Sequence, residues 1–248
     1  MAIAVISDIH GNLGALEAVL ADARARGASR VVNLGDILSG PLDAVGTAER
    51  LMALGLETIR GNHERQLLDL AREAMNLSDA ATDAVLEPRH RDWLAALPVE
   101  MWLEPDLYAC HGSPRSDLEM LLETVEPQGC RAATGAEVTE RLGGIDAALV
   151  LCGHSHKQRA VRLEDGRLVV NPGSVGLPAY AEDHPWPHVI ESGTSEARYA
   201  LVERGADGEP DAWQVQLCAV AYDWAAAARR AAEGGREDWA RALATGYA

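Results

Sequence analysis

The sequence of 248 residues predicts an α/β fold with mixed β-structure divided between two sheets. Over residues 1–60, short apolar runs alternate with helical patterns, which is typical of strand–helix–strand units with parallel strands. Later apolar runs are separated by turn signals, Glu104-Pro105-Asp106 and Asp165-Gly166, which predict antiparallel hairpins. Parallel pairing followed by antiparallel pairing predicts mixed sheets.

The first sixty residues contain clear signals for strands and helices. Residues 2–7 form a continuous apolar run, as expected of a strand buried on both faces. Asn12 can cap a helix whose apolar side chains recur at helical spacing and which ends at Gly27. The sequence then predicts a strand over 31–34, a helix over 42–54 and a strand over 57–60.

The rest of the chain completes the two sheets and ends in helices. We expect helices over 64–77, 88–97 and 134–142, strands over 99–103, 107–111, 147–152, 159–163, 168–171, 198–203 and 212–219, and a long loop over 172–196. We interpret residues 1–248 as a single domain with a helical tail at about 222–246. This tail, helical over 223–232 and 236–244, would serve as a packing or homodimer helix pair.

The numbers of acidic and basic residues argue against some classes of binding partner. The chain has 38 acidic and 22 basic residues, a formal net charge of −16. This excess argues against nucleic-acid or anionic-lipid binding, for which basic stripes are expected. The sequence shows no apolar run long enough to cross a membrane and no secretory signal, and its four cysteines show no CxxC spacing. These features predict a cytoplasmic protein with reduced thiols.

Polar residues of unusual type follow the predicted strands. The groups are Asp8-Ile9-His10, Gly35-Asp36, Gly61-Asn62-His63-Glu64, His111-Gly112 and Gly153-His154-Ser155-His156. Functional sites of open α/β sheets assemble in the crevice outside the carboxyl ends of the strands. We therefore expect these five segments to meet in one site.

The chemistry of these residues favours a metal site. Imidazoles, carboxylates and one carboxamide, with no thiolate in the pattern, suit Mn, Fe or Zn ions. Asp8 and His10 are two residues apart, as are His154 and His156, so each pair can direct its side chains toward one ion. A carboxylate between the pairs, such as Asp36, could bridge two ions.

The ordered set D-x-H, G-D, G-N-H-E, H-G and G-H-x-H resembles the calcineurin-like metallophosphoesterases over roughly residues 3–176. The segment Asn171-Pro172-Gly173-Ser174-Val175-Gly176 resembles the compact bacterial and archaeal phosphodiesterase branch of that superfamily. The resemblance implies two packed mixed β-sheets flanked by helices, an α/β/β/α sandwich. It also implies a site for two divalent transition-metal ions at one sheet edge.

The resemblance further implies a role for each motif residue. The first metal would be held by Asp8, His10 and His156, the second by Asn62, His111 and His154, and Asp36 would bridge both. A hydroxide between the metals would attack the phosphorus of a small phosphodiester or nucleotide. His63 would contact the phosphoryl group together with Asn62, and would assist the leaving group.

Two departures and two alternatives stay open. The stretch from Gly35 to Pro41 lacks the second Asp and the Arg of the protein Ser/Thr phosphatases, so the group that orients His63 is unknown. The alternatives to a small-phosphoester hydrolase are a diadenosine-polyphosphate or protein Ser/Thr phosphatase and a catalytically silent metal-binding scaffold.

Outside the motifs, the sequence supports only weaker interpretations. The loop over 178–191 could form a rim of the site, with Tyr180 and Trp186 stacking on a substrate ring. His90, His184 and His188 match no motif, and we interpret them as solvated or hydrogen-bonded histidines.

Overall fold

The computed structural model describes residues 2–205 and 213–248. Its first sheet has the strand order β14-β13-β1-β2-β3. The strands are β1 (Ala2–Ile6), β2 (Ala28–Asn33), β3 (Glu57–Thr58), β13 (Ala197–Arg204) and β14 (Trp213–Val220). β1, β2 and β3 pair in parallel, whereas β13 pairs antiparallel with both β1 and β14. The predicted start of the last strand, residue 212, lies outside the described residues.

The second sheet has the strand order β4-β5-β8-β10-β9. The strands are β4 (Glu100–Glu104), β5 (Leu107–Cys110), β8 (Leu149–Leu151), β9 (Arg159–Arg162) and β10 (Leu168–Asn171). β8 pairs in parallel with β5 and β10, and both edge pairs are the antiparallel hairpins that the turn signals predict. The predicted mixed sheets are thus confirmed.

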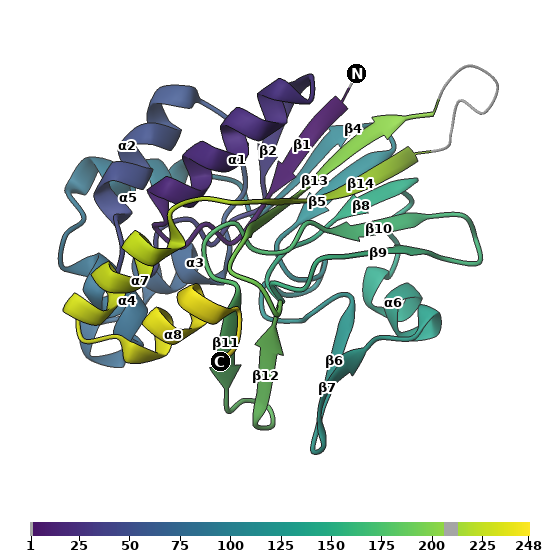
Figure 1. The fold of residues 1–248 in the computed structure, drawn as a ribbon. Coiled ribbons are helices and arrows are strands. Elements are labelled where there is room, and N and C mark those ends of the chain that lie inside the picture. The colour runs from purple at the N-terminus through teal and green to yellow at the C-terminus, as the bar shows by residue number, and fades with distance from the viewer. Residues whose placement is uncertain (1, 206–212) are drawn as a thin grey trace.

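The two sheets pack face to face, and the alternation of side chains along each strand explains why. Ile3 and Val5 of β1 pack with Leu149 and Leu151 of β8 in the core between the sheets. Side chains one residue along, such as Ile6, point to the other face and pack against helices. Because both faces of the central strands are buried, these strands are continuous apolar runs. Figure 1 shows helices on both sides of the sandwich.

Helices cover the outer faces. They are α1 (Leu13–Ala25), α2 (Ala44–Leu54), α3 (Asn62–Asp69), α4 (Leu77–Asp83), α5 (Pro88–Ala96) and α6 (Gly135–Leu142), with a 3₁₀ turn at Arg72–Ala74. Asn12 caps α1 as predicted, because its side-chain oxygen accepts from the backbone of Ala15 at 3.2 Å. Gly55 ends α2 in the left-handed conformation (φ 59°).

The helical tail consists of α7 (Trp224–Glu233) and α8 (Glu237–Thr245). Its apolar face, including Trp239 and Leu243, packs on Leu177 and Ala179. The helical tail therefore packs against the rest of its own chain. No helix in the part of the chain that the structure describes is long and apolar enough to span a membrane.

Three sequence expectations about the connections are wrong. Residues 172–196 contain a hairpin, β11 (Ala179–Glu182) and β12 (His188–Glu191), rather than a long loop. A second hairpin, β6 (Glu123–Glu126) and β7 (Gly129–Ala132), was not expected. Each of these strands has only four residues of mixed character, so their sequences are too short to show the alternation that identifies a strand.

The third expectation, a single helix over 64–77, fails because the chain turns at Leu70, which is extended (φ −88°, ψ 142°). Asn76 then caps α4, where its side-chain oxygen accepts from the backbone of Ser78 and Asp79, both at 2.9 Å. Figure 1 shows that both hairpins project from the same end of the sandwich, where α8 lies beside β11.

Candidate metal centre

The predicted site residues lie where strands of both sheets end. Asp8 follows β1 and Asp36 follows β2, whereas Asn62 begins α3 after β3. His111 follows β5, and His154 lies in the turn after β8. Gly153 donates its backbone N–H to the carbonyl of His111 at 2.7 Å, so the two turns of the second sheet are joined directly. The face-to-face packing of the sheets therefore brings all five motifs together.

The side chains form three overlapping groups of donor atoms. Within each group the donor atoms lie within 4.8 Å of one another. The groups are Asp8, His10 and His156; His10, Asp36 and His63; and Asp36, His111 and His154. Asp36 and His10 each belong to two groups, so the donors are continuous across the site. The first group has the same residues as the first ligand set that the family resemblance implies, and the third contains His111 and His154 of the second set together with Asp36.

The imidazole rings are oriented by backbone carbonyls. The Nδ1 atoms of His10, His111 and His156 lie 2.7–2.8 Å from the carbonyl oxygens of Ser39, Leu34 and Leu177, respectively. Each Nδ1 therefore carries a proton and donates, so that a neutral ring keeps its lone pair on Nε2. This arrangement is the one that orients histidine ligands in metal proteins.

The unprotonated imidazole nitrogens lie next to one another rather than next to hydrogen-bond donors. His10 Nε2 lies 3.0 Å from His156 Nε2, although neither nitrogen carries a proton in the tautomer just described. His154 is turned the other way, with Nε2 3.1 Å from the carbonyl of Leu118, so that its Nδ1 is the free acceptor. Two neutral imidazole acceptors this close repel one another, whereas a cation bound by both would attract them.

The Asp8 carboxylate also lacks hydrogen-bond donors, whereas Asp36 and Asn62 lie beside His111. Both side-chain oxygens of Asp8 are buried and have no hydrogen-bond partner among the described residues. His111 Nε2 lies 3.1 Å from an oxygen of Asp36 and 3.1 Å from the side-chain oxygen of Asn62. A buried carboxylate without donors is costly unless a charge compensates it. The donor set of N and O atoms therefore fits divalent transition-metal ions.

Backbone strain is concentrated in the same residues. Among the described residues, the non-glycine positions with positive φ are Asp8, His10, Asp36, His154 and His156, with φ between 51° and 66°. This conformation costs on the order of 1–3 kcal/mol for a residue with a side chain and persists where function requires it. All five belong to the predicted ligand set. The turns therefore aim side chains inward at the expense of backbone stability.

The electrostatics of the site keep several donors unprotonated. Burial, reinforced by His156 and His63, lowers the pKa of His10 to about 3. Burial and the neighbouring His111 lower the pKa of His154 to about 4. Burial opposes a charge on His111 too, but Asp36 outweighs it and raises the pKa of His111 to about 10. The carboxylates thus draw positive charge into the buried site.

A buried glutamate that the sequence interpretation did not single out supports this geometry. Glu64, of the G-N-H-E motif, has no exposed surface. Its carboxylate accepts from the backbone N–H groups of Asp36 (2.9 Å), Ile37 (2.8 Å) and Gly61 (2.9 Å). One side chain thereby ties the turn after β2 to the start of α3.

Replacing Glu64 with Ala should destabilise the fold by about 3 kcal/mol, because three buried N–H groups lose an ionised acceptor. Chemical denaturation of the variant measures this loss. Glu73→Ala is the matched control, since Glu73 lies on the exposed 3₁₀ turn. A Glu64→Ala protein within about 0.5 kcal/mol of the unmodified chain would refute this role.

The group that orients His63 is Asp79. His63 Nδ1 lies 2.6 Å from Asp79 Oδ1, and Asp79 is fully buried. Ser39 Oγ donates to the same oxygen at 2.6 Å, and Asn76 Nδ2 donates to the other at 2.7 Å. Burial disfavours a charge on His63, yet Asp36 and Asp79 raise the pKa of His63 to about 9. Asp79 therefore fixes the ring with its Nε2 directed away from the carboxylate.

Sequence reasoning missed Asp79 because it lies on α4, just beyond the helix expected over 64–77, in a stretch to which no element or motif was assigned. The available signal was local: Asn76 followed three residues later by Asp79 resembles a helix N-terminus. That signal predicts a helix start but does not connect α4 to His63.

Asp79→Asn should lower kcat by about 10- to 100-fold with unchanged metal content, because the imidazole loses the partner that holds its tautomer. The measurement is kcat and KM across pH, together with metal analysis. Asp83→Asn, on the same helix but paired with Arg72 and Arg91, is the control. Equal pH profiles for Asp79→Asn and the unmodified protein would contradict the orienting role.

The three histidines outside the motifs and the two aromatic residues of the loop over 178–191 have different surroundings. His90 is buried and contacts Glu49 at 2.6 Å, His188 contacts the carbonyl of Trp186 at 2.8 Å, and His184 is exposed. Tyr180 lines a groove of about 1310 Å³ over the site, but Trp186 does not. The expectation that Trp186 stacks on substrate is thus unsupported, because Trp186 is exposed between β11 and β12 and does not line this groove.

A family model of the calcineurin-like phosphoesterase superfamily domain matches residues 1–185. The chain belongs to this superfamily. The match covers every motif from Asp8 to His156 and the segment around Asn171.

Comparison with individual proteins shows that this phosphoesterase superfamily member has similarity beyond residues 1–185. A metallophosphoesterase of Sphaerobacter thermophilus is 25% identical and has a TM-score of 0.75, covering 99% of this chain and 100% of its own. An uncharacterised protein of Methanocaldococcus jannaschii is 26% identical over 235 residues, 89% of this chain and 88% of that protein. A candidate diadenosine tetraphosphatase, 18% identical, has a TM-score of 0.52 over 89% of this chain and 94% of its own, a likeness of fold.

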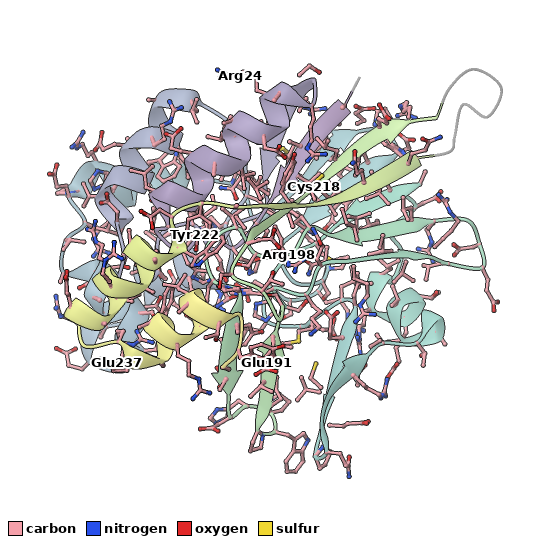
Figure 2. The ribbon with its side chains drawn as sticks, in the orientation of Figure 1. Arg24, Glu191, Arg198, Cys218, Tyr222 and Glu237 are labelled. Atoms are coloured by element: carbon pink, nitrogen blue, oxygen red, sulfur yellow. The ribbon has the colours of Figure 1, made fainter. Side chains whose placement is uncertain are left out.

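The similarity to the Sphaerobacter protein spans the helical tail as well as the motif region. In this phosphoesterase superfamily member, the tail adds a wall to the site: the ring of Trp239 lies 5.8 Å from that of His10, edge to face. Figure 2 shows Tyr222 on the segment leading into α7, where its hydroxyl accepts from Asn12 Nδ2 at 3.1 Å.

Proposed function

We propose that this protein is a metal-dependent phosphoesterase that hydrolyses small phosphodiesters or nucleotides. The observation that carries the proposal is the convergence of unprotonated imidazole nitrogens on the Asp8 and Asp36 carboxylates at the base of an open groove. A set of N and O donors arranged in this way is expected to hold two divalent ions, of Mn, Fe or Zn. Membership in the phosphoesterase superfamily supports the same reaction class.

We assign the ligands as the family resemblance implies. Asp8, His10 and His156 would hold one ion, Asn62, His111 and His154 the other, and Asp36 both. When bound, the ions would neutralise phosphoryl charge and lower the pKa of an attacking water. Side chains of the protein would carry out the remaining steps.

His63 and Asn62 lie next to each other at the start of α3, and both line the groove. The His63 backbone N–H donates to Asp36 Oδ1 at 3.0 Å, which fixes the backbone of His63 beside the central carboxylate. We assign His63 Nε2 to the leaving oxygen, to which it can donate a proton. Asp79 holds the opposite nitrogen, so that the proton is delivered from the side that faces the groove.

The test is hydrolysis by protein reconstituted separately with Mn²⁺, Fe²⁺ and Zn²⁺, with bis(p-nitrophenyl) phosphate, p-nitrophenyl phosphate, diadenosine tetraphosphate and a phosphoserine peptide side by side. We expect turnover of the diester or monoester, lost on chelation and restored by the metal. Bound metal without turnover of any substrate would instead identify a silent scaffold. A preference for the tetraphosphate or the peptide would move the assignment to the corresponding alternative.

A further inference from the structure

We infer that the groove selects phosphoesters with a single phosphoryl group and a large, flat, apolar ester group, in preference to polyphosphates. This inference rests on the proposed function. It adds to that function the class of substrate, which we infer from the side chains that line the groove.

Apolar side chains flank the histidines of the site. The ring of Tyr180, on β11, lies 4.8 Å from that of His156, edge to face. Trp239, on α8, is in the same relation to His10 at 5.8 Å. Since both rings line the groove, a substrate phosphoryl group at the histidines has aromatic edges on two sides.

The outer part of the groove is apolar as well. Leu77 and Leu118, which both line the groove, are 74% and 54% exposed, and apolar side chains gathered in one groove mark a ligand-binding surface. Leu118 adjoins the site directly, since its carbonyl is the partner of His154 Nε2. Met120 and Val125 extend the same wall. An apolar ester group placed here would cover surface that water now contacts.

The charged groups of the groove oppose a second phosphate. Two arginines line it among the described residues, and both are engaged. Arg141 donates to the carbonyls of Met120, Leu121 and Glu123 and to Thr124 Oγ, at 2.7–3.3 Å.

Arg236 is paired with Asp238 through two contacts of 2.9 and 2.6 Å, and donates to Ser78 Oγ at 2.9 Å. The exposed carboxylates of Glu182, Asp183 and Asp238 line the same groove. A polyphosphate chain needs arginine or lysine donors along its length. This groove offers it acidic side chains and arginines that already have partners.

The test compares p-nitrophenyl phosphodiesters that share one leaving group and differ in the second ester group: methyl, 1-naphthyl and 5′-thymidyl. We expect kcat/KM for the naphthyl or the thymidyl ester to exceed that for the methyl ester by about tenfold or more. Which of the two is larger identifies an aryl or a nucleoside group. Calorimetric titration with naphthylmethylphosphonate against methylphosphonate should show the same preference in Kd without turnover.

Leu118→Asp should reduce the naphthyl-to-methyl ratio at least about fivefold, because it places a charge in the apolar wall. Leu217→Asp is the matched control: Leu217 is 40% exposed on β14, outside the groove, and its ratio should match that of the unmodified protein. A flat series overturns this inference and leaves the proposed function intact. Faster turnover of diadenosine tetraphosphate than of any diester overturns this inference and moves the assignment to the diadenosine-polyphosphate alternative. Hydrolysis of no ester by the metal-loaded protein overturns the proposed function itself.

Discussion

Asp36→Asn is expected to lower phosphoesterase activity by about a thousandfold or more and to reduce the metal content of the protein at one or both positions. The reason is geometric and electrostatic. Asp36 belongs to two of the three donor groups, and one of its oxygens lies 3.1 Å from His111 Nε2. The neutral amide keeps the size of the side chain but removes the charge that attracts cations from both sides.

The measurement is metal content after dialysis, followed by kcat at saturating added metal. Asp92→Asn is the control, because Asp92 is exposed on α5. An Asp36→Asn protein that retains two metals per chain with full affinity would show that another group bridges the site.

His63→Ala is expected to retain its metals and to lose roughly 10²- to 10⁴-fold in kcat. Asp79 holds the imidazole, and the His63 backbone N–H donates to Asp36, so removal of the ring takes away a positioned proton donor and leaves the ligand side chains in place. The loss should be larger for an alkyl ester than for a p-nitrophenyl ester, because a poor leaving group depends more on protonation.

Kinetics on the two esters, with metal analysis of the same samples, checks this expectation. Full activity of His63→Ala would mean that the role assigned to His63 is wrong. Loss of metal along with activity would assign His63 to the ligands, which its place in one donor group with His10 and Asp36 allows.

The motif residues were predictable because their chemistry is local to the sequence. Strands buried on both faces are recognisable as apolar runs, and polar groups that directly follow such runs must lie at the strand ends. This reasoning located Asp8, Asp36 and His111 before any packing was considered. It also led to mixed β-structure in two sheets, because parallel units and hairpins each have their own sequence pattern, whereas the face-to-face sandwich was implied by the family resemblance.

Residues that act through distant partners were not predictable in the same way. Asp79 is an ordinary helical residue in the sequence, and only the placement of α4 against the site brings it within 2.6 Å of His63. The short hairpins were missed because strands of four residues are too short for periodicity to indicate a strand. Their place beside the site depends on contacts between β7 and β12 and between α8 and β11.

By itself the sequence determined the fold class and the donor set of this phosphoesterase superfamily member, since apolar periodicity and strand-end chemistry are properties of neighbouring residues. Only the tertiary structure decided how His63 is oriented and what surrounds the phosphoryl position. Those features are contacts between segments far apart in the chain, such as Trp239 against His10. They exist only once the core has fixed where each segment ends, because side-chain contacts depend on packing at ångström precision.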